Sequence, residues 1–277
     1  MKRIRPVRPV LLFQYGILLI LGIFFGFPLI WMVYSSFKSN SELVNNIWAL
    51  PVNPSFDAFR SVLEVPAFKT YFSNSLIITI ISVGFLTIAA AMAAFALARL
   101  RVPGAKILLY VFLAGLMIPP HVTLIPLYSM LRDLGLLNKL IALFFPYVGF
   151  GLPVSIYILH TFISQLPIDL EEAARLDGAS FARFFWKILL PTLSPALVAV
   201  VIINVINVWN EYLFSLTFVS GNSEAYPLPL GVYSMVISFS SIQYNRAFSA
   251  FTLAALPVLV IFYLMQKRII KSLSETI

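Results

Sequence analysis

The sequence predicts an all-α membrane protein with six transmembrane helices. Of its 277 residues, 60% are hydrophobic and only 11% are charged, and the mean hydropathy is +0.94. These values lie outside the range of soluble globular domains. The apolar runs are continuous and long enough to cross a hydrocarbon core about 30 Å thick as helices of about 20 residues. Strands of a membrane barrel would instead alternate in polarity over about 10 residues, so a barrel is not expected.

Six runs with at most one charged residue each place the expected spans within a single transmembrane domain, 1–277. The spans lie at about 10–35, 71–97, 107–129, 140–163, 195–218 and 247–266. The first run follows basic residues, as a secretory signal does, but it is too long for a signal and has no convincing cleavage site. We therefore expect it to be retained as a helix.

The distribution of charge predicts the orientation in the membrane. Most of the 19 Lys and Arg residues gather before the first span, after the second, after the fourth and after the last. The positive-inside rule makes this side cytoplasmic, with both termini and the loop 166–192 inside and the loop 220–245 outside. The net charge of +8 is therefore attributed to orientation in membrane lipid, and no nucleic-acid partner is expected.

The loop 166–192 contains the signals of a short helix. Asp169 and Glu172 have the spacing of a capping box, which predicts a helix over 170–177. Gly178 follows, where a left-handed residue can end the helix. A helix about 12 Å long is marginal in water without a partner. The alternative is a solvated loop in which the caps are incidental.

The faces of this helix favour packing against another surface. We expect one face of the helix to pack closely against another surface. This face carries Leu170, Ala173, Ala174 and Asp177, because these positions are neighbours at helical spacing. Glu171 and Arg175 form a favourable pair elsewhere on the helix. Ser180 then caps a second helix, whose apolar stripe is typical of a helix in the membrane interface. The stripe consists of Phe181, Phe184, Phe185 and Ile188.

The loop carries Glu172-Ala173-Ala174, then Gly178, Ile188 and Leu190-Pro191, in the spacing of a known motif. This pattern resembles the EAA loop of permease subunits in binding-protein-dependent ABC importers. The resemblance extends over about 74–266 and includes "NVWNEYLFSLTF". It is closest to the carbohydrate-type branch, similar to the second permease subunit of maltose and glycerol-phosphate transporters, and implies a type I importer permease fold.

The resemblance implies specific roles and partners. In that family the short helix docks into a groove on a separate ATPase, so Glu172, Ala173, Ala174 and Gly178 are expected to be ATPase-coupling residues. It also implies two ATP-binding cassette ATPase subunits, a second permease subunit and an extracytoplasmic solute-binding protein, in a prokaryotic cell membrane. The sequence "QKRIIKSLSETI" departs from the glycine-rich tail that relatives often have, so no role is assigned to it.

The chain itself lacks the motifs of a catalytic or cofactor-binding protein. It contains no G-x-x-x-x-G-K-[ST] phosphate loop, so ATP is expected to be used by a partner subunit. It has no Cys, and its two His residues have no acidic or cysteine companion at ligand spacing, so no metal site is expected. We expect no enzyme activity and no cofactor in this chain.

Polar residues in the fifth span indicate a substrate pathway. Asn204, Asn207 and Glu211 recur at i, i+3 and i+7, with Asn210 adjacent, so they are expected to form one polar stripe. Polar groups inside a membrane are unfavourable and therefore mark functional positions. The pathway interpretation assigns them to a carbohydrate substrate. The alternative for Asn204 and Asn207 is a set of interhelical hydrogen bonds.

Prolines predict that the third and fourth spans are kinked. Pro119, Pro120 and Pro126 interrupt the third span, and proline removes a backbone donor from a helix. His121 lies among them, either as a pathway residue or with its imidazole bonded to a carbonyl.

Other functions remain open at this stage. An ABC permease for a polyol, glycerol phosphate or a peptide would carry the same loop, because the motif indicates that an ATPase binds and does not indicate which substrate is transported. An ion-coupled secondary transporter would use Glu211 and His121 to exchange protons. A membrane-embedded enzyme is disfavoured, because no paired carboxylates or nucleophile–base set occurs among the spans.

Overall fold

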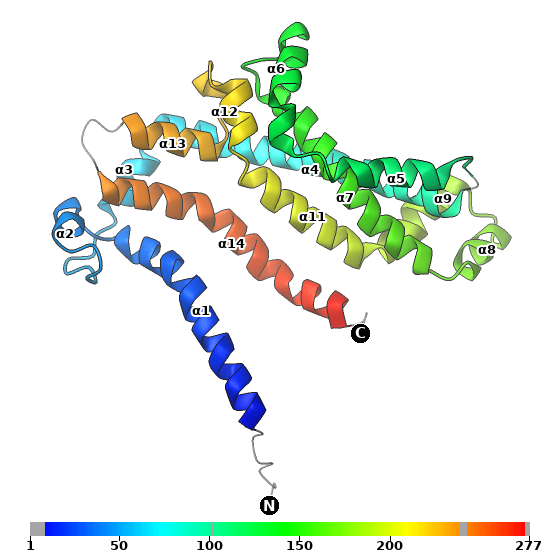
Figure 1. Cartoon of the computed structure of the whole chain (residues 1–277), viewed down its shortest axis with the longest axis horizontal. Helices are drawn as coiled ribbons and strands as arrows, with labels where there is room; N and C mark the ends of the chain where they lie inside the picture. Colours follow the sequence, from blue (N-terminus) through cyan, green and yellow to red (C-terminus); the bar gives the residue numbers. More distant parts are fainter. Residues whose placement is uncertain (1–8, 101, 239–242, 275–277) are drawn as a thin grey trace, which may run out of the picture. The chain divides into compact units, whose positions relative to one another are not determined.

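The computed structural model describes residues 9–100, 102–238 and 243–274, and every regular element in these ranges is helical (Figure 1). The chain divides into two compact units, Met1–Val65 with Met235–Ala254 and Pro66–Ser234 with Ala255–Ile277. The longer α-helices are α1 (Pro9–Ser35), α4 (Pro66–Arg99), α5 (Ala105–Gly115), α6 (Leu124–Asp133), α7 (Phe144–Gln165), α11 (Ser194–Trp209), α13 (Leu228–Ser238) and α14 (Tyr244–Ser274). The shorter ones are α2 (Asn40–Asn45), α3 (Asp57–Leu63), α8 (Asp169–Leu176), α9 (Phe181–Phe184), α10 (Leu190–Thr192) and α12 (Leu213–Val219), with the single turns η1 (Pro120–Thr123), η2 (Leu140–Leu143), η3 (Phe185–Leu189) and η4 (Ser223–Ala225).

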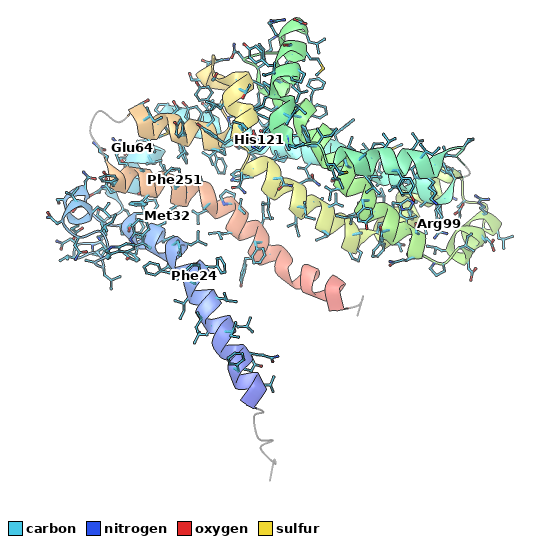
Figure 2. All side chains as sticks on the ribbon, in the orientation of Figure 1. Phe24, Met32, Glu64, Arg99, His121 and Phe251 are labelled. Atoms are coloured by element: carbon cyan, nitrogen blue, oxygen red, sulfur yellow. The ribbon has the colours of Figure 1, made fainter. Side chains whose placement is uncertain are left out.

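The first unit is built around the C-terminal end of α1. The apolar stretch Phe13–Ser35 of α1 is long enough to span a membrane, and none of its most apolar window is buried. Phe24, labelled in Figure 2, is 71% exposed. Beyond the helix, buried hydroxyls join the chain to α14: Ser36 Oγ lies 2.9 Å from Thr252 Oγ1. An exposed apolar helix with a polar anchor at its end is what a lipid-facing span requires.

The second unit is a packed core of α4, α7 and α11. Small residues on α4, including Ala90, Ala91 and Ala94, are fully buried, which lets neighbouring backbones approach closely. Ile156, Leu159 and other buried apolar residues of α7 complete this core. The close packing of these three long helices positions the segments that begin at their ends.

Two of the expected spans are broken helices. Pro119 and Pro120 separate α5 from the segment Pro120–Asp133, and the two parts are bent by 91°. The proline-induced break predicted in the third span is therefore confirmed. The fifth expected span, 195–218, is interrupted, because α11 ends at Trp209 and α12 begins at Leu213. Before it, the segment Phe181–Thr192 of the expected loop is apolar and is bent by 75° against α11. Within the described residues, four helices are long and apolar enough to span a membrane, or six spans result when each bent pair counts as one.

The segment 220–245, expected to lie outside between two spans, is largely helical, because it contains η4 and α13. In α13, Leu228 and Val232 are 0% and 1% exposed. The N–H of Leu228 donates to Ser75 Oγ of α4 at 2.7 Å. Pro229 lies in the first turn of α13, where proline is tolerated. Gly231 is needed here, because a Cβ at this position would overlap the ring of Tyr71.

Tyr71 of α4 is buried inside the second unit and does not face the lipid boundary. The side chain of Tyr71 is only 6% exposed and its ring stacks on Tyr226 at 5.8 Å. Burial against α13 takes the ring away from the lipid boundary.

Candidate functional site

Arg99, the last residue of α4, fixes the end of α7 from which α8 departs. Its Nη2 donates to the carbonyl oxygen of Ile163 at 2.8 Å and to that of Leu166. The last carbonyls of a helix have no partner within the helix, and a cation is favourable there. Figure 2 shows Arg99 at the end of the second unit where α8 and α9 lie. The basic residue that sequence assigned to orientation therefore also positions the short helix.

The predicted capping box at the start of α8 is wrong. The helix begins at Asp169, one residue earlier than expected, and its N-cap is Ile168, which makes no side-chain cap bond. The N–H of Glu172 bonds instead to the carbonyl of Ile168 at 3.2 Å. The carboxylates in the first turn still interact favourably with the helix dipole.

The C-terminal end of α8 is as predicted. Gly178 has φ of +76°, the left-handed conformation that glycine adopts without a Cβ clash. The N–H of Gly178 bonds to Arg175 O at 3.0 Å and that of Ala179 to Ala174 O at 2.9 Å, which is a Schellman motif. The helix therefore ends abruptly, and the chain turns into α9.

The two alanines of α8 point in different directions, contrary to the prediction that both face the same surface. Ala174 is 5% exposed and packs into the chain's own core beside the partly buried Leu170. Ala173 and Glu172 are exposed, and Leu176 is 89% exposed. Successive residues lie about 100° apart around a helix. The outward face of α8 is therefore Glu172, Ala173 and Leu176.

Two further local predictions are confirmed. Arg175 Nη2 lies 2.6 Å from Glu171 Oε1, the expected i, i+4 pair. Ser180 caps α9, and its Oγ accepts from the N–H of Arg183 at 3.3 Å.

The aromatic residues after Ser180 pack on α4. Phe184 and Phe185 are 7% and 4% exposed, and their ring centroids lie 5.8 and 6.0 Å from that of Phe95. Half of the stripe that was expected in the membrane interface therefore belongs to the protein core, while Phe181 is 57% exposed.

One continuous buried cluster joins α8 to the middle of α11. It contains Ala174 of α8, Phe95 of α4, Ile163 of α7 and Val200 of α11, among other residues. Val200 is fully buried, and its carbonyl accepts from Asn204 Nδ2 at 2.8 Å. The packed cluster therefore connects α8 to the turn of α11 that precedes Asn204.

Asn204 lies in a buried hydrogen-bond network between α7 and α11. Its side chain is 3% exposed and donates to Ser155 Oγ at 2.9 Å, while Ser155 Oγ donates to Gly151 O at 2.7 Å. The interhelical bond that was one of the two alternatives for Asn204 is therefore present. The close approach requires Gly151, because a Cβ there would lie 2.5 Å from Asn204 Oδ1.

A cavity of about 420 Å³ adjoins this network. Its walls come from α5, η1, α7, α11 and α12, and they include Gly115, Leu116, Ile118, Pro120, His121, Pro146, Tyr147, Phe150, Gly151, Asn204, Asn207, Val208, Glu211, Leu213 and Phe214. Three of the four predicted pathway residues and the nearby His121 are therefore brought together. The rings of Tyr147, Phe150 and Phe214 were missed, because aromatic residues within apolar runs carry no local signal.

Glu211 reaches the cavity by a different route from the one predicted. It lies beyond the last residue of α11, so it is not the i+7 member of a helical stripe. Its Oε1 accepts from the N–H of Phe214 at 2.6 Å, and its Oε2 accepts from Ser215 N–H, Ser215 Oγ and Tyr147 Oη at 2.9–3.1 Å. The carboxylate thus satisfies free N–H groups at the start of α12.

Asn210 and Asn207 differ in what their amides can do. Asn210 is the C-cap of α11, donates to Ile206 O at 2.8 Å and is not among the cavity residues. Asn207 and His121 line the cavity, and their side chains make no hydrogen bond with the part of the chain that the structure describes. These two groups are available to a ligand's hydroxyl groups.

Among residues 9–100, 102–238 and 243–274, no group of three or more His, Asp or Glu side chains is arranged to hold a metal ion. The polar groups around the cavity are therefore amides, a hydroxyl, an imidazole and a carboxylate that is already bonded.

Comparisons with known proteins identify the family. Residues 86–275 match the family described as "Binding-protein-dependent transport system inner membrane component". The ABC transporter permease protein ORF2 of Caldicellulosiruptor sp. (strain Rt8B.4) is 40% identical over 247 residues, 89% of each chain. The diacetylchitobiose uptake system permease protein NgcG of Streptomyces coelicolor is 32% identical over 263 residues, 95% of this chain and 87% of NgcG.

A solved structure shares the fold. One chain of a bacterial ABC transporter involved in the import of the acidic polysaccharide alginate superposes with a TM-score of 0.82 at 22% identity, covering 95% of this chain and 98% of that one. The chain therefore belongs to the binding-protein-dependent transport system inner membrane component family, the multi-pass, all-helical permease subunits of ABC importers.

Proposed function

We propose that this chain is a permease subunit of a carbohydrate importer, in which α8 receives the movement of an ATPase and α11 carries it to the substrate cavity. The observation that carries the proposal is the buried cluster from Ala174 to Val200, which ends one helical turn before Asn204 at the cavity. A packed cluster between a surface helix and a cavity gives a mechanical connection between them.

The outward face of α8 is the surface proposed for the ATPase. Leu176 is an apolar side chain that is almost fully exposed, and Glu172 and Ala173 lie beside it. Gly178 ends the helix so that this face is presented on a short, defined element. In this assignment Ala174 acts from inside, by attaching α8 to the core.

The proposed assembly follows from the family. Two ATP-binding cassette subunits hydrolyse ATP, a second permease completes the pathway, and an extracytoplasmic solute-binding protein delivers the substrate. The loop 166–192 and both termini are assigned to the cytoplasm by the positive-inside rule. We assign this chain no catalytic residue, no cofactor and no nucleic-acid partner.

A carbohydrate fits the chemistry of the cavity. A volume of about 420 Å³ lies within the range of small-molecule sites, about 300–1,000 Å³. The rings of Tyr147, Phe150 and Phe214 offer flat apolar surfaces, and the free groups of Asn207 and His121 suit hydroxyl groups. A relative, NgcG, is named for diacetylchitobiose uptake. We therefore place an oligosaccharide before a polyol, glycerol phosphate or peptide as cargo.

Glu211 has a structural role beside the cavity. Both carboxylate oxygens accept hydrogen bonds from the start of α12, and Tyr147 Oη is a further donor. The carboxylate is thus held within the chain by several donors, whereas Asn207 and His121 keep free polar groups on the cavity wall.

The test is uptake by the complete importer reconstituted in vesicles, with a panel of oligosaccharides presented by the binding protein. Asn207→Ala is expected to lower the uptake rate about 2- to 10-fold, because one hydrogen bond contributes about 0.5–1.5 kcal/mol. Asn210→Ala is the matched control on the same helix, because its amide is outside the cavity. Equal uptake by the two variants would refute the cavity assignment, and stimulation only by non-carbohydrate solutes would refute the cargo.

A further inference from the structure

The segment 46–53, between α2 and α3, folds back along α1; we name it the platform. Trp31 Nε1 donates to the carbonyl of Ile47 at 3.2 Å, and Tyr34 Oη donates to that of Trp48 at 3.1 Å. The ring of Trp48 stacks on that of Phe27, with centroids 6.1 Å apart and planes at 25°. Figure 1 shows α2 and the chain that follows it beside the C-terminal end of α1. The platform therefore lies next to the helix and not beyond its end.

These contacts set the depth of the platform. Phe27 lies about two turns before Ser35, where α1 ends, which is about 12 Å along the helix axis. The apolar stretch Phe13–Ser35 is the part of α1 that can span a membrane. A side chain stacked on Phe27 consequently lies at the level of the membrane leaflet that surrounds the C-terminal half of α1.

Side chains of the same unit satisfy four N–H groups of the platform, which makes it less unfavourable to place this non-helical segment at the membrane boundary. Asn46 Oδ1 accepts from the N–H groups of Trp48 and Ala49, at 3.1 and 3.2 Å. Glu42 Oε1 accepts from those of Val52 and Asn53, at 3.0 and 3.3 Å. In water these groups would bond to solvent without such an arrangement, whereas in lipid each unsatisfied group is unfavourable by several kcal/mol.

Three carbonyl groups at the start of the platform also accept hydrogen bonds from side chains. Lys38 is only 2% exposed, and its Nζ donates to Asn46 O at 2.8 Å and to Ile47 O at 3.3 Å. The ammonium group is thus turned away from the platform's surface and used to hold its backbone. Trp31 and Tyr34 supply the donors for Ile47 and Trp48 described above.

Apolar side chains make up most of the platform surface, beside the exposed amides of Asn46 and Asn53. Trp48, Leu50 and Val52 are 64%, 71% and 77% exposed. No charged residue occurs between Glu42 and Asp57. A contiguous exposed apolar surface of this kind is unfavourable in water and marks contact with a membrane or another protein.

We propose that the platform is inserted in the membrane, as an anchor that contacts the lipid around the C-terminal half of α1. Depth favours lipid over a soluble partner, because the platform lies beside a membrane-spanning stretch and side chains satisfy part of its backbone. Trp48, stacked on Phe27, then contacts lipid beside α1, and Leu50 and Val52 are exposed to the same leaflet as the chain returns towards α3. The anchor fixes the height of α1 in the bilayer. This inference depends on the membrane location of the chain and not on the coupling or the cargo proposed above.

The absence of cysteine from the chain allows a direct test with single introduced cysteines carrying a nitroxide spin label. Leu50→Cys and Val52→Cys are labelled in the complete importer, which is then reconstituted in phosphatidylcholine vesicles. Glu64→Cys is the control, an exposed site just after α3 in the same unit (Figure 2). Collision of each label with oxygen and with a water-soluble nickel complex is measured, and lipids with nitroxides at known depths calibrate the result.

The proposal predicts that both platform labels collide more often with oxygen than with nickel, at a depth of about 5–10 Å below the headgroups. The Glu64→Cys label is expected to show the reverse. Nickel accessibility at Leu50→Cys and Val52→Cys equal to that at Glu64→Cys would overturn the proposal, because the platform would then lie in water. Low accessibility to both reagents would also overturn it, because a partner protein would then cover the surface. Uptake by each labelled importer verifies that the complex is folded.

Discussion

Replacing Gly151 by alanine perturbs the point at which the buried cluster meets the cavity. A Cβ at this position would lie 2.5 Å from Asn204 Oδ1 and would also overlap Leu86 Cδ1. Carbon atoms in contact are about 3.5–4.0 Å apart, so one or both neighbours must move by about 1 Å. Both are confined, because Leu86 is 1% exposed and Asn204 is 3% exposed.

The expected destabilisation follows from two terms. Forcing an extra methyl group into a packed core is unfavourable by about 1–3 kcal/mol. Displacing Asn204 weakens its bond to Ser155 Oγ, and a hydrogen bond contributes about 0.5–1.5 kcal/mol. Together these terms give about 2–4 kcal/mol, with a loss of uptake because the cluster no longer meets α11 in its native geometry.

The assay is thermal unfolding of the purified importer, followed by uptake in vesicles. Gly149→Ala is the matched control on the same helix, because a Cβ there meets no atom within 4 Å. Gly151→Ala should lower the unfolding midpoint by several degrees, while Gly149→Ala should leave it unchanged. Equal midpoints for the two variants would refute the packing argument.

Three further outcomes are expected. Leu176→Asp should reduce ATPase coupling while leaving the unfolding midpoint unchanged, because the side chain is 89% exposed; an unchanged coupling ratio would contradict its role. Arg99→Met should lower stability by about 1–3 kcal/mol, because the carbonyls of Ile163 and Leu166 lose a charged donor; Arg99→Lys, measured beside it, should recover part of the loss. A hydrogen bond from the N–H of Ser39 lowers the pKa of the Glu42 carboxyl below 4.5; desolvation acts in the opposite direction, and the N–H groups of Val52 and Asn53 lower the pKa further. The stabilisation by the Glu42 carboxylate is therefore present above pH 4.5 and is lost as the pH falls through the lower pKa of the folded state. Unfolding midpoints of wild type and Glu42→Gln should therefore converge in acid, and a constant difference would exclude this origin.

Features that depend on neighbouring residues along the chain were predictable from sequence. Gly178 ends α8 and Ser180 caps α9 because each acts on backbone groups within a few residues. The break at Pro119 and Pro120 follows from the donor that proline lacks. The two expected members Asn204 and Asn207 reach the cavity because α11 is regular through both positions.

Features that depend on tertiary packing were not predictable in the same way. Ala173 and Ala174 look equivalent in the sequence, and only the placement of α8 on the core decides that Ala174 is buried. The periodic stripe failed at Glu211, because its carboxylate caps the next helix and α11 ends before it. The capping box expected near Asp169 is absent, whereas a complete one occurs at Ser39 and Glu42. Local sequence signals therefore predicted where helices end better than they predicted which helix face is buried.

The orientation of α8 and the attachment of its outward face to an ATPase are the central claim, and site-specific crosslinking tests them most directly. Leu176→Cys in the cysteine-free chain is treated, in the assembled importer, with a short reagent that joins thiols to amines. Thr161→Cys, an exposed position on α7, is the control. Our account predicts a crosslinked product of this chain with the ATPase from Leu176→Cys and none from Thr161→Cys. Failure of Leu176→Cys to capture the ATPase in an importer that still hydrolyses ATP and transports would contradict it.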